Sequence, residues 1–111
     1  MAETQTIKTP SFISPDPETL TNLYVVPAET QSIISTINVC NTTASSNFFR
    51  IAATSGGSPT TGNYLVYNMD IEPYETVSFT QGITLDSNDL IAVYAASAGL
   101  AFNLFKMEVT Q

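Results

Sequence analysis

Hydrophobic and polar residues alternate with a period of two along most of the chain, and turn-forming residues interrupt this pattern at short intervals. In Ser32–Cys40, alternation places Ile33, Ile37 and Val39 on one face and Thr36 and Asn38 on the other. No window shows the i, i+3, i+4, i+7 spacing of an amphipathic helix. The pattern therefore predicts an all-β chain.

Seven or eight short strands are predicted in this way. They lie at Leu23–Val26, Ser32–Cys40, Asn47–Ala53, Asn63–Asn68, a short piece near Asp70, Thr76–Thr80, Leu90–Ala96 and Leu100–Val109. The segments between them are rich in Asn, Ser, Gly and Pro, which favour turns. Short strands at regular spacing, with no helical segments, predict a single antiparallel β-sandwich of the jelly-roll or Ig-like kind.

The first nineteen residues have a different character from the rest. Pro10, Pro15 and Pro17 lie within eight positions, and each removes a backbone donor and disfavours helix at the preceding residue. We predict that residues 1–19 form an extended N-terminal arm and that residues 20–111 form the β-sandwich domain. Such an arm is either disordered or laid across another subunit.

Three apolar residues of this arm are the expected partner-binding residues. They are Ile7, Phe12 and Ile13. A segment that only solvates the domain has no need of a large aromatic side chain. We therefore expect these three side chains to anchor the arm on a partner.

Several predicted strands are apolar on both faces. In the last one, three residues on one face alternate with three on the other: Leu100, Phe102 and Leu104 against Phe105, Met107 and Val109. A small sandwich buries only one face of each sheet, so the surplus apolar face needs another cover. A symmetric second copy provides one, and we expect a homo-oligomer.

The charge balance excludes two classes of partner. Only 12% of the 111 residues are charged, and Lys8, Arg50 and Lys106 are the only basic ones. Ten acidic residues give a net charge of −7. Nucleic-acid binding requires a basic patch, and so does attachment to an anionic membrane surface. We therefore expect neither partner.

Targeting signals do not change this picture. No apolar run approaches the length needed to span a bilayer, and residues 1–4 lack the basic and apolar regions of a signal peptide. We expect a soluble protein that is made in a cytoplasm.

The residue types that are missing exclude most catalytic chemistry. The chain has no histidine and one cysteine, Cys40, so neither a Ser–His–Asp triad nor a His or thiolate metal site is available. The acidic residues Asp70, Glu72 and Glu75 match no calcium-loop spacing, and we interpret them as a turn, with a Ca²⁺ site as the minor alternative. Asp86–Asp89 reads as an Asx-type turn. We expect no enzyme, no cofactor and no metal.

Arg50 is the only arginine of the chain. Strand alternation places its side chain on the face opposite to Phe49 and Ile51. There it either bridges to a carboxylate on an adjacent strand or subunit, or has a surface role that contributes little energy.

Six segments, taken in their order along the chain, resemble a group of small β-sandwich structural proteins of tailed bacteriophages, including phages of marine cyanobacteria. The segments are Val26–Thr30, Ile37–Asn41, Phe49–Ala52, Tyr64–Tyr67, Val93–Ala95 and Phe102–Phe105. The resemblance covers residues 20–109 and leaves the arm outside. It implies a virion component, used either for capsid decoration or as a tail or fibre module, and it implies no catalytic residues.

The leading hypothesis is a non-enzymatic virion protein that decorates or cements the outer capsid surface as a homotrimer. Its partner is then the major capsid protein or another virion protein, and many weak contacts across a repeated lattice bridge the capsid subunits. Such a protein is located in the virion, which is assembled in the host cytoplasm.

The alternative is a tail, fibre or neck module that recognises a host cell-surface glycan. The loops 41–46 and 55–62, with Tyr64, Tyr67 and Tyr74 nearby, are the candidate sugar contacts. Neutral hydroxyls, amides and aromatic rings are the groups that suit this kind of ligand.

Overall fold

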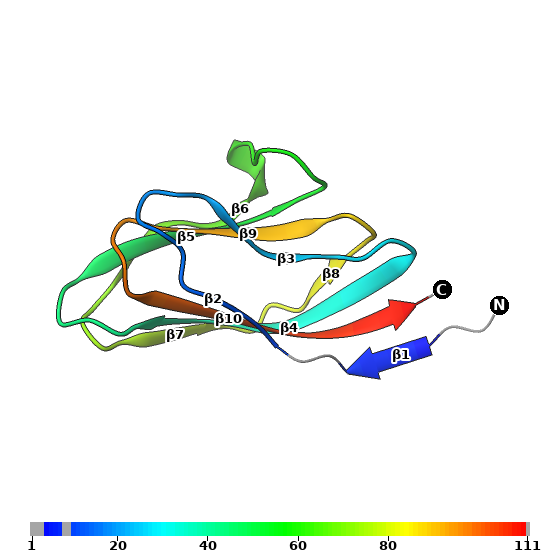
Figure 1. Cartoon of the computed structure of the whole chain (residues 1–111), viewed down its shortest axis with the longest axis horizontal. Coiled ribbons are helices and arrows are strands. Elements are labelled where there is room, and N and C mark those ends of the chain that lie inside the picture. Colours follow the sequence, from blue (N-terminus) through cyan, green and yellow to red (C-terminus); the bar gives the residue numbers. More distant parts are fainter. Residues whose placement is uncertain (1–3, 8–9, 111) are drawn as a thin grey trace.

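The computed structural model of the chain describes residues 4–7 and 10–110, which form two antiparallel sheets packed face to face (Figure 1). The elements are β1 (Thr4–Ile7), β2 (Ser11–Ile13), β3 (Thr21–Val25), β4 (Thr30–Asn41), β5 (Asn47–Thr54), η1 (Thr61–Asn63), β6 (Tyr64–Ile71), β7 (Thr76–Phe79), β8 (Ile83–Leu85), β9 (Leu90–Ala95) and β10 (Leu100–Thr110). Within the described residues, no helix is long and apolar enough to cross a membrane.

The order of the strands defines the topology. In one sheet, called sheet A here, β10 and β4 are central; β1 and β2 both pair with β10, and β7 and β8 both pair with β4. In the other, sheet B, the order is β3–β9–β5–β6. If β1 and β2 are counted as one interrupted edge strand, and β7 and β8 as another, each sheet has four strands. The order of these strands is that of a jelly roll. The predicted antiparallel β-sandwich is confirmed, in its jelly-roll form.

The arm is part of sheet A. β1 runs along the end of β10, with Thr4 opposite Thr110, and β2 follows further along, with Ile13 opposite Phe102. Both are edge strands, and Pro10 lies between them, where its missing N–H interrupts no ladder. The arm therefore pairs with its own chain, whereas the sequence predicted a segment outside the sandwich.

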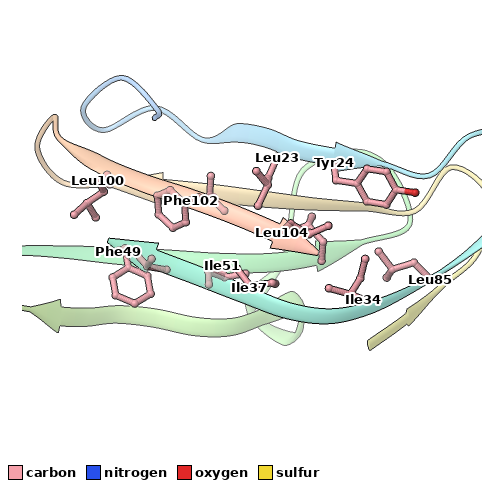
Figure 2. Close-up of a cluster of buried hydrophobic side chains, with 14 of the residues drawn as sticks. Leu23, Tyr24, Ile34, Ile37, Phe49, Ile51, Leu85, Leu100, Phe102 and Leu104 are labelled. Carbon is pink, nitrogen blue, oxygen red and sulfur yellow. The ribbon is translucent and has the colours of Figure 1, made fainter. Parts of the chain in front are cut away.

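The core lies between the two sheets and is almost entirely apolar (Figure 2). Within it, the ring of Phe49 lies edge-on to Phe79 and to Phe102, with ring centroids 6.1 Å and 6.0 Å apart. These three residues come from β5, β7 and β10, so the cluster joins sheet B to sheet A. As predicted, Leu100 and Leu104 are buried beside Phe102 on one face of β10.

One predicted face is wrong because of a β-bulge. Ile37 and Val39 are buried, but Ile33 is 40% exposed and Ile34 is buried in its place. The pairing of β4 with β10 shifts at Ser35, which has no partner in the register. One extra residue in a strand reverses the alternation beyond it. Ile33 therefore points to the outer face of sheet A.

Replacing Gly99 with alanine is expected to lower the free energy of unfolding by about 1–2 kcal/mol, the usual cost of a side chain in left-handed backbone space. Gly99 has φ +103°, and an added Cβ would lie 2.3 Å from Cγ2 of Thr43. Thr43 cannot rotate away freely, because its hydroxyl bonds Asn41 and Ser45.

The control for this substitution is Gly62→Ala. Gly62 has no positive φ, and its added Cβ would meet nothing within 4 Å. Urea denaturation should separate the two variants. Equal midpoints for Gly99→Ala and Gly62→Ala would contradict the expectation.

Candidate functional site

The three predicted arm residues have different surroundings. Phe12 is 64% exposed and lies on the outer face of sheet A, opposite Asn103 of β10. Ile13 packs against the core of its own chain. Ile7 pairs with Met107 through the backbone of β1, and its side chain lies outside the described residues. Phe12 is thus the arm residue whose described side chain is available to a partner.

Phe12 belongs to a wider apolar patch on the outer face of sheet A. Met107 lies opposite the exposed Ile33 of β4, and Phe105 lies diagonally across from Phe12 on the same face of the sheet. Both Phe105 and Met107 are half-buried. We call Phe12, Ile33, Phe105 and Met107 the sheet A patch. It contains Phe105 and Met107 of the surplus apolar face that the sequence predicted, and Ile33 is added through the bulge. Val109, the third residue predicted for that face, is buried.

Sheet B carries a different kind of surface. Arg50 lies on its outer face, opposite to Phe49 and Ile51 as predicted. Its Nε donates a hydrogen bond of 2.7 Å to Oδ1 of Asn68 on the neighbouring strand. The adjacent-strand partner is therefore an amide, and the carboxylate that the sequence suggested is absent from this position.

Two tyrosine rings hold the Arg50 guanidinium from both sides. The Cζ atom of Arg50 lies 4.3 Å from the ring centroid of Tyr67 on β6 and 4.3 Å from that of Tyr94 on β9. Because β5 lies between β9 and β6, the guanidinium is stacked between the two rings. Such cation–π contacts each contribute about 0.5–2 kcal/mol. We call Arg50, Tyr67, Asn68 and Tyr94 the arginine clamp.

The two loops proposed for glycan binding lie at opposite ends of the sandwich. Loop 41–46 bonds to Tyr74 and Gly99 at one end. Loop 55–62 folds back over sheet B, and Figure 1 shows η1 above this sheet on the side away from sheet A. Tyr74 therefore belongs to the first end, whereas Tyr64 and Tyr67 adjoin the second loop. The five elements do not form one site.

Loop 55–62 and the start of β6 line a solvent-open hollow beside the arginine clamp. Its lining is formed by Pro59, Thr60, Thr61, Tyr64 and Tyr67. The rings of Tyr64 and Tyr67 meet edge to face, with centroids 4.9 Å apart. The hollow therefore combines aromatic rings with hydroxyl groups.

The predicted acidic turn is confirmed for Glu72 and Glu75, whereas Asp70 lies in β6, opposite Phe48. Oε1 of Glu75 accepts a hydrogen bond of 2.8 Å from the backbone N–H of Glu72. In a second turn, the backbone N–H of Asp86 donates to Oδ2 of Asp89, and the backbone N–H of Asp89 donates to the carbonyl oxygen of Asp86. Among the described residues, no group of three or more Asp, Glu, His or Cys residues is placed to hold a metal ion. Cys40 is half-buried in β4.

A polar layer closes one end of the core and was not foreseen from the sequence. The hydroxyl of Tyr24 donates a hydrogen bond to Oε2 of Glu108, and Nζ of Lys106 lies 4.5 Å above the Tyr24 ring. Lys106 also donates to the hydroxyl of Ser11 in the arm. Burial, followed by the hydrogen bond to Glu108, raises the pKa of Tyr24 from its ordinary 10.0 to about 12.

No protein-family model matches the chain, and no curated protein matches its sequence. Solved structures do share its fold. A chain of the Bacillus endospore appendages, which form a novel family of disulfide-linked pili, matches with a TM-score of 0.57 and 19% identity, over 96% of this chain and 90% of that one.

Two viral structures are similar as well. A chain of the IBDV viral particle matches with a TM-score of 0.52 and 9% identity, over 98% of this chain and 30% of that one. A chain in the acidic stable capsid of Helicobacter pylori bacteriophage KHP30 matches with a TM-score of 0.51 and 12% identity, over 99% of this chain and 94% of that one. The chain thus has a β-sandwich fold that is found in a pilus, a viral particle and a phage capsid.

Proposed function

We propose that this chain is a non-enzymatic structural protein of a bacteriophage virion, which decorates the outer capsid surface and bridges capsid subunits. The observation that carries the proposal is the sheet A patch. Phe12, Ile33, Phe105 and Met107 place four large apolar side chains on one outer face of the sandwich, outside its own core. Exposed apolar patches of this kind mark protein–protein contact sites.

The similar structures support this proposal in two ways: the length of the matched chain and the kind of assembly that contains it. The KHP30 capsid contains a chain that this protein covers over 94% of its length, so the fold occurs as a small unit in a phage capsid. The endospore appendage match extends the same fold to another repetitive assembly. In both cases the likeness is one of fold, and the assembly role is carried to this chain by the proposal alone.

The partner of the sheet A patch is the major capsid protein or another virion protein, contacted at an apolar area on the capsid exterior. A homotrimer placed at a symmetric lattice position makes several such contacts at once. Each contact is weak, but the second and third become intramolecular once the first has formed. Bridging of neighbouring capsid subunits follows from this arrangement.

The test is the number of copies of this chain per purified virion, measured by quantitative mass spectrometry against the major capsid protein. A decoration protein is expected in hundreds of copies. A handful of copies would place the chain at the tail, neck or fibres and overturn capsid decoration. Virions without the chain would end the virion hypothesis.

Surface variants connect this result to the sheet A patch. Phe12→Asp combined with Phe105→Asp is expected to lower occupancy on the capsid at least tenfold, because each substitution places a charge in an apolar contact. Tyr74→Asp is the matched control, since Tyr74 is 70% exposed and lies in the turn after β6, outside the patch. Retained occupancy of a folded Phe12→Asp/Phe105→Asp protein would contradict the assignment of the patch.

A further inference from the structure

The outer face of sheet B holds a guanidinium in a fixed orientation. An exposed arginine normally has considerable rotamer freedom, with about 2 kcal/mol of side-chain entropy. In the arginine clamp that freedom is reduced, because the rings of Tyr67 and Tyr94 both lie 4.3 Å from Cζ and Asn68 accepts the Nε–H. A residue held in this way is preorganised for a ligand.

The local backbone is irregular at this point, and the irregularity builds the clamp. The register between β5 and β6 shifts between Phe49 and Ile51, so two β6 residues, Tyr67 and Asn68, lie opposite Arg50. Asn68 takes a left-handed conformation with φ 53°. A regular strand would bring only one of these side chains to Arg50. Bulges are known to redirect side chains at functional sites.

The clamp leaves one edge of the guanidinium available. Nε donates to Asn68, so the remaining donors are those of the two terminal nitrogens. Among the residues described by the structure, no carboxylate forms an ion pair with Arg50. Two parallel N–H groups in a fixed plane match the two oxygens of a carboxylate.

The hollow beside the clamp indicates what the carboxylate is attached to. Tyr67 is 58% exposed and belongs to both features, so it is their common wall. Thr60 and Thr61 add hydroxyls, and the bonds from Thr60 to Oδ1 of Asn63 hold this rim in place. Aromatic rings with a few oriented polar groups are the lining of a small-molecule site, and rings with hydroxyls suit a sugar.

We propose that the arginine clamp and the adjoining hollow bind an acidic sugar, with the sugar carboxylate on the terminal N–H groups of Arg50 and the ring against Tyr64 and Tyr67. The net charge of −7 and the exposed Asp70, which lies on β6 with Tyr67 and Asn68, repel a ligand more strongly the more negative charges it carries. A sugar with a single carboxylate is therefore favoured over a polyanion. It faces away from sheet A, so capsid attachment through the sheet A patch leaves it accessible.

Isothermal titration calorimetry of the full chain tests this proposal with two probes that each carry one carboxylate, galacturonic acid and 3′-sialyllactose. The methyl ester of each serves as the uncharged match. At least one acid is expected to bind at least tenfold more tightly than its ester, because only the acid pairs with Arg50. Absence of binding by both acids, or equal binding of acid and ester, would overturn the proposal.

Three variants locate the binding. Arg50→Gln is expected to weaken the acid at least tenfold and to leave the ester unchanged, and Arg50→Lys should restore only part of the loss because lysine lacks the planar fork. Tyr74→Ala, at the other end of the sandwich, should have no effect. Unchanged acid affinity in a folded Arg50→Gln protein would overturn the assignment.

An NMR titration of the unmodified chain locates the binding site without relying on variants that could fail to fold. The side-chain NMR signals of Tyr64, Tyr67 and Tyr94 should shift on titration with the binding acid, while those of Tyr74 stay in place. Shifts confined to other residues would place the sugar elsewhere and contradict the site. These readouts are independent of the number of copies per virion, so either proposal can fail without the other.

Discussion

Replacing Phe49 with alanine is expected to lower the free energy of unfolding by about 3–5 kcal/mol, the cost of truncating a fully buried aromatic residue. The Phe49 side chain has no solvent exposure and contacts Phe79 and Phe102 edge to face. Its removal leaves a cavity where sheet B meets two strands of sheet A. A domain of this size has about 5–15 kcal/mol of stability in total, so the variant is close to unfolding.

Urea denaturation followed by circular dichroism measures this loss. The control is Phe12→Ala, the same change at a residue that is 64% exposed, which should alter the free energy by no more than about 0.5 kcal/mol. Similar losses in the two variants would show that the Phe49 cluster does not hold the sheets together. The slope of the denaturation curve should stay unchanged, since both variants unfold the same surface.

Replacing Tyr24 with phenylalanine is expected to lower the free energy of unfolding by about 1.5–3 kcal/mol at neutral pH, the value of a hydrogen bond to a charged group. The Tyr24 hydroxyl donates to the buried carboxylate of Glu108, and the substitution removes this donor while it keeps the ring. Phenylalanine also keeps the ring beneath Lys106. Thermal and urea denaturation at pH 7 measure the difference.

The same pair predicts a pH dependence on the alkaline side. The folded protein raises the pKa of Tyr24 to about 12 from 10.0, so folding favours the neutral phenol. This contribution to stability is complete below pH 10 and is lost as the pH rises towards 12. Tyr24→Phe should lack this part of the alkaline loss. Parallel curves for the two proteins between pH 10 and 12 would contradict the coupling.

The strands from β3 onward were largely predictable because their side chains alternate between a core and an outer face. β4, β5, β9 and β10 begin and end within three residues of their predicted bounds. β8 was missed because three residues of Ile83–Leu85 are too few for a period to be recognised. β2 was missed because the flanking residues Pro10 and Pro15 indicate an extended segment equally well inside and outside a sheet.

The sheet A patch and the arginine clamp both depend on β-bulges, and the position of a bulge cannot be read from the sequence. Ile33 joins the sheet A patch because Ser35 is an extra residue, and Tyr67 meets Arg50 together with Asn68 for a similar reason. An asparagine in the middle of a strand is the available signal at Asn68. The orientation of Arg50 was predictable, but its tyrosine partners were not, because they follow from strand order.

The position of β10 in the sheet also determines when the chain is able to fold. β10 is the last of the described strands to be synthesised, yet it lies between β4 and the arm, and Thr4 pairs with Thr110. The core therefore lacks Phe102 and Leu104 until β10 has left the ribosome, after all the other described strands. Contacts that are so distant in sequence give slow folding, on the scale of milliseconds to seconds. During synthesis the earlier strands remain without a partner, so the nascent chain is most prone to aggregation just before β10 is complete.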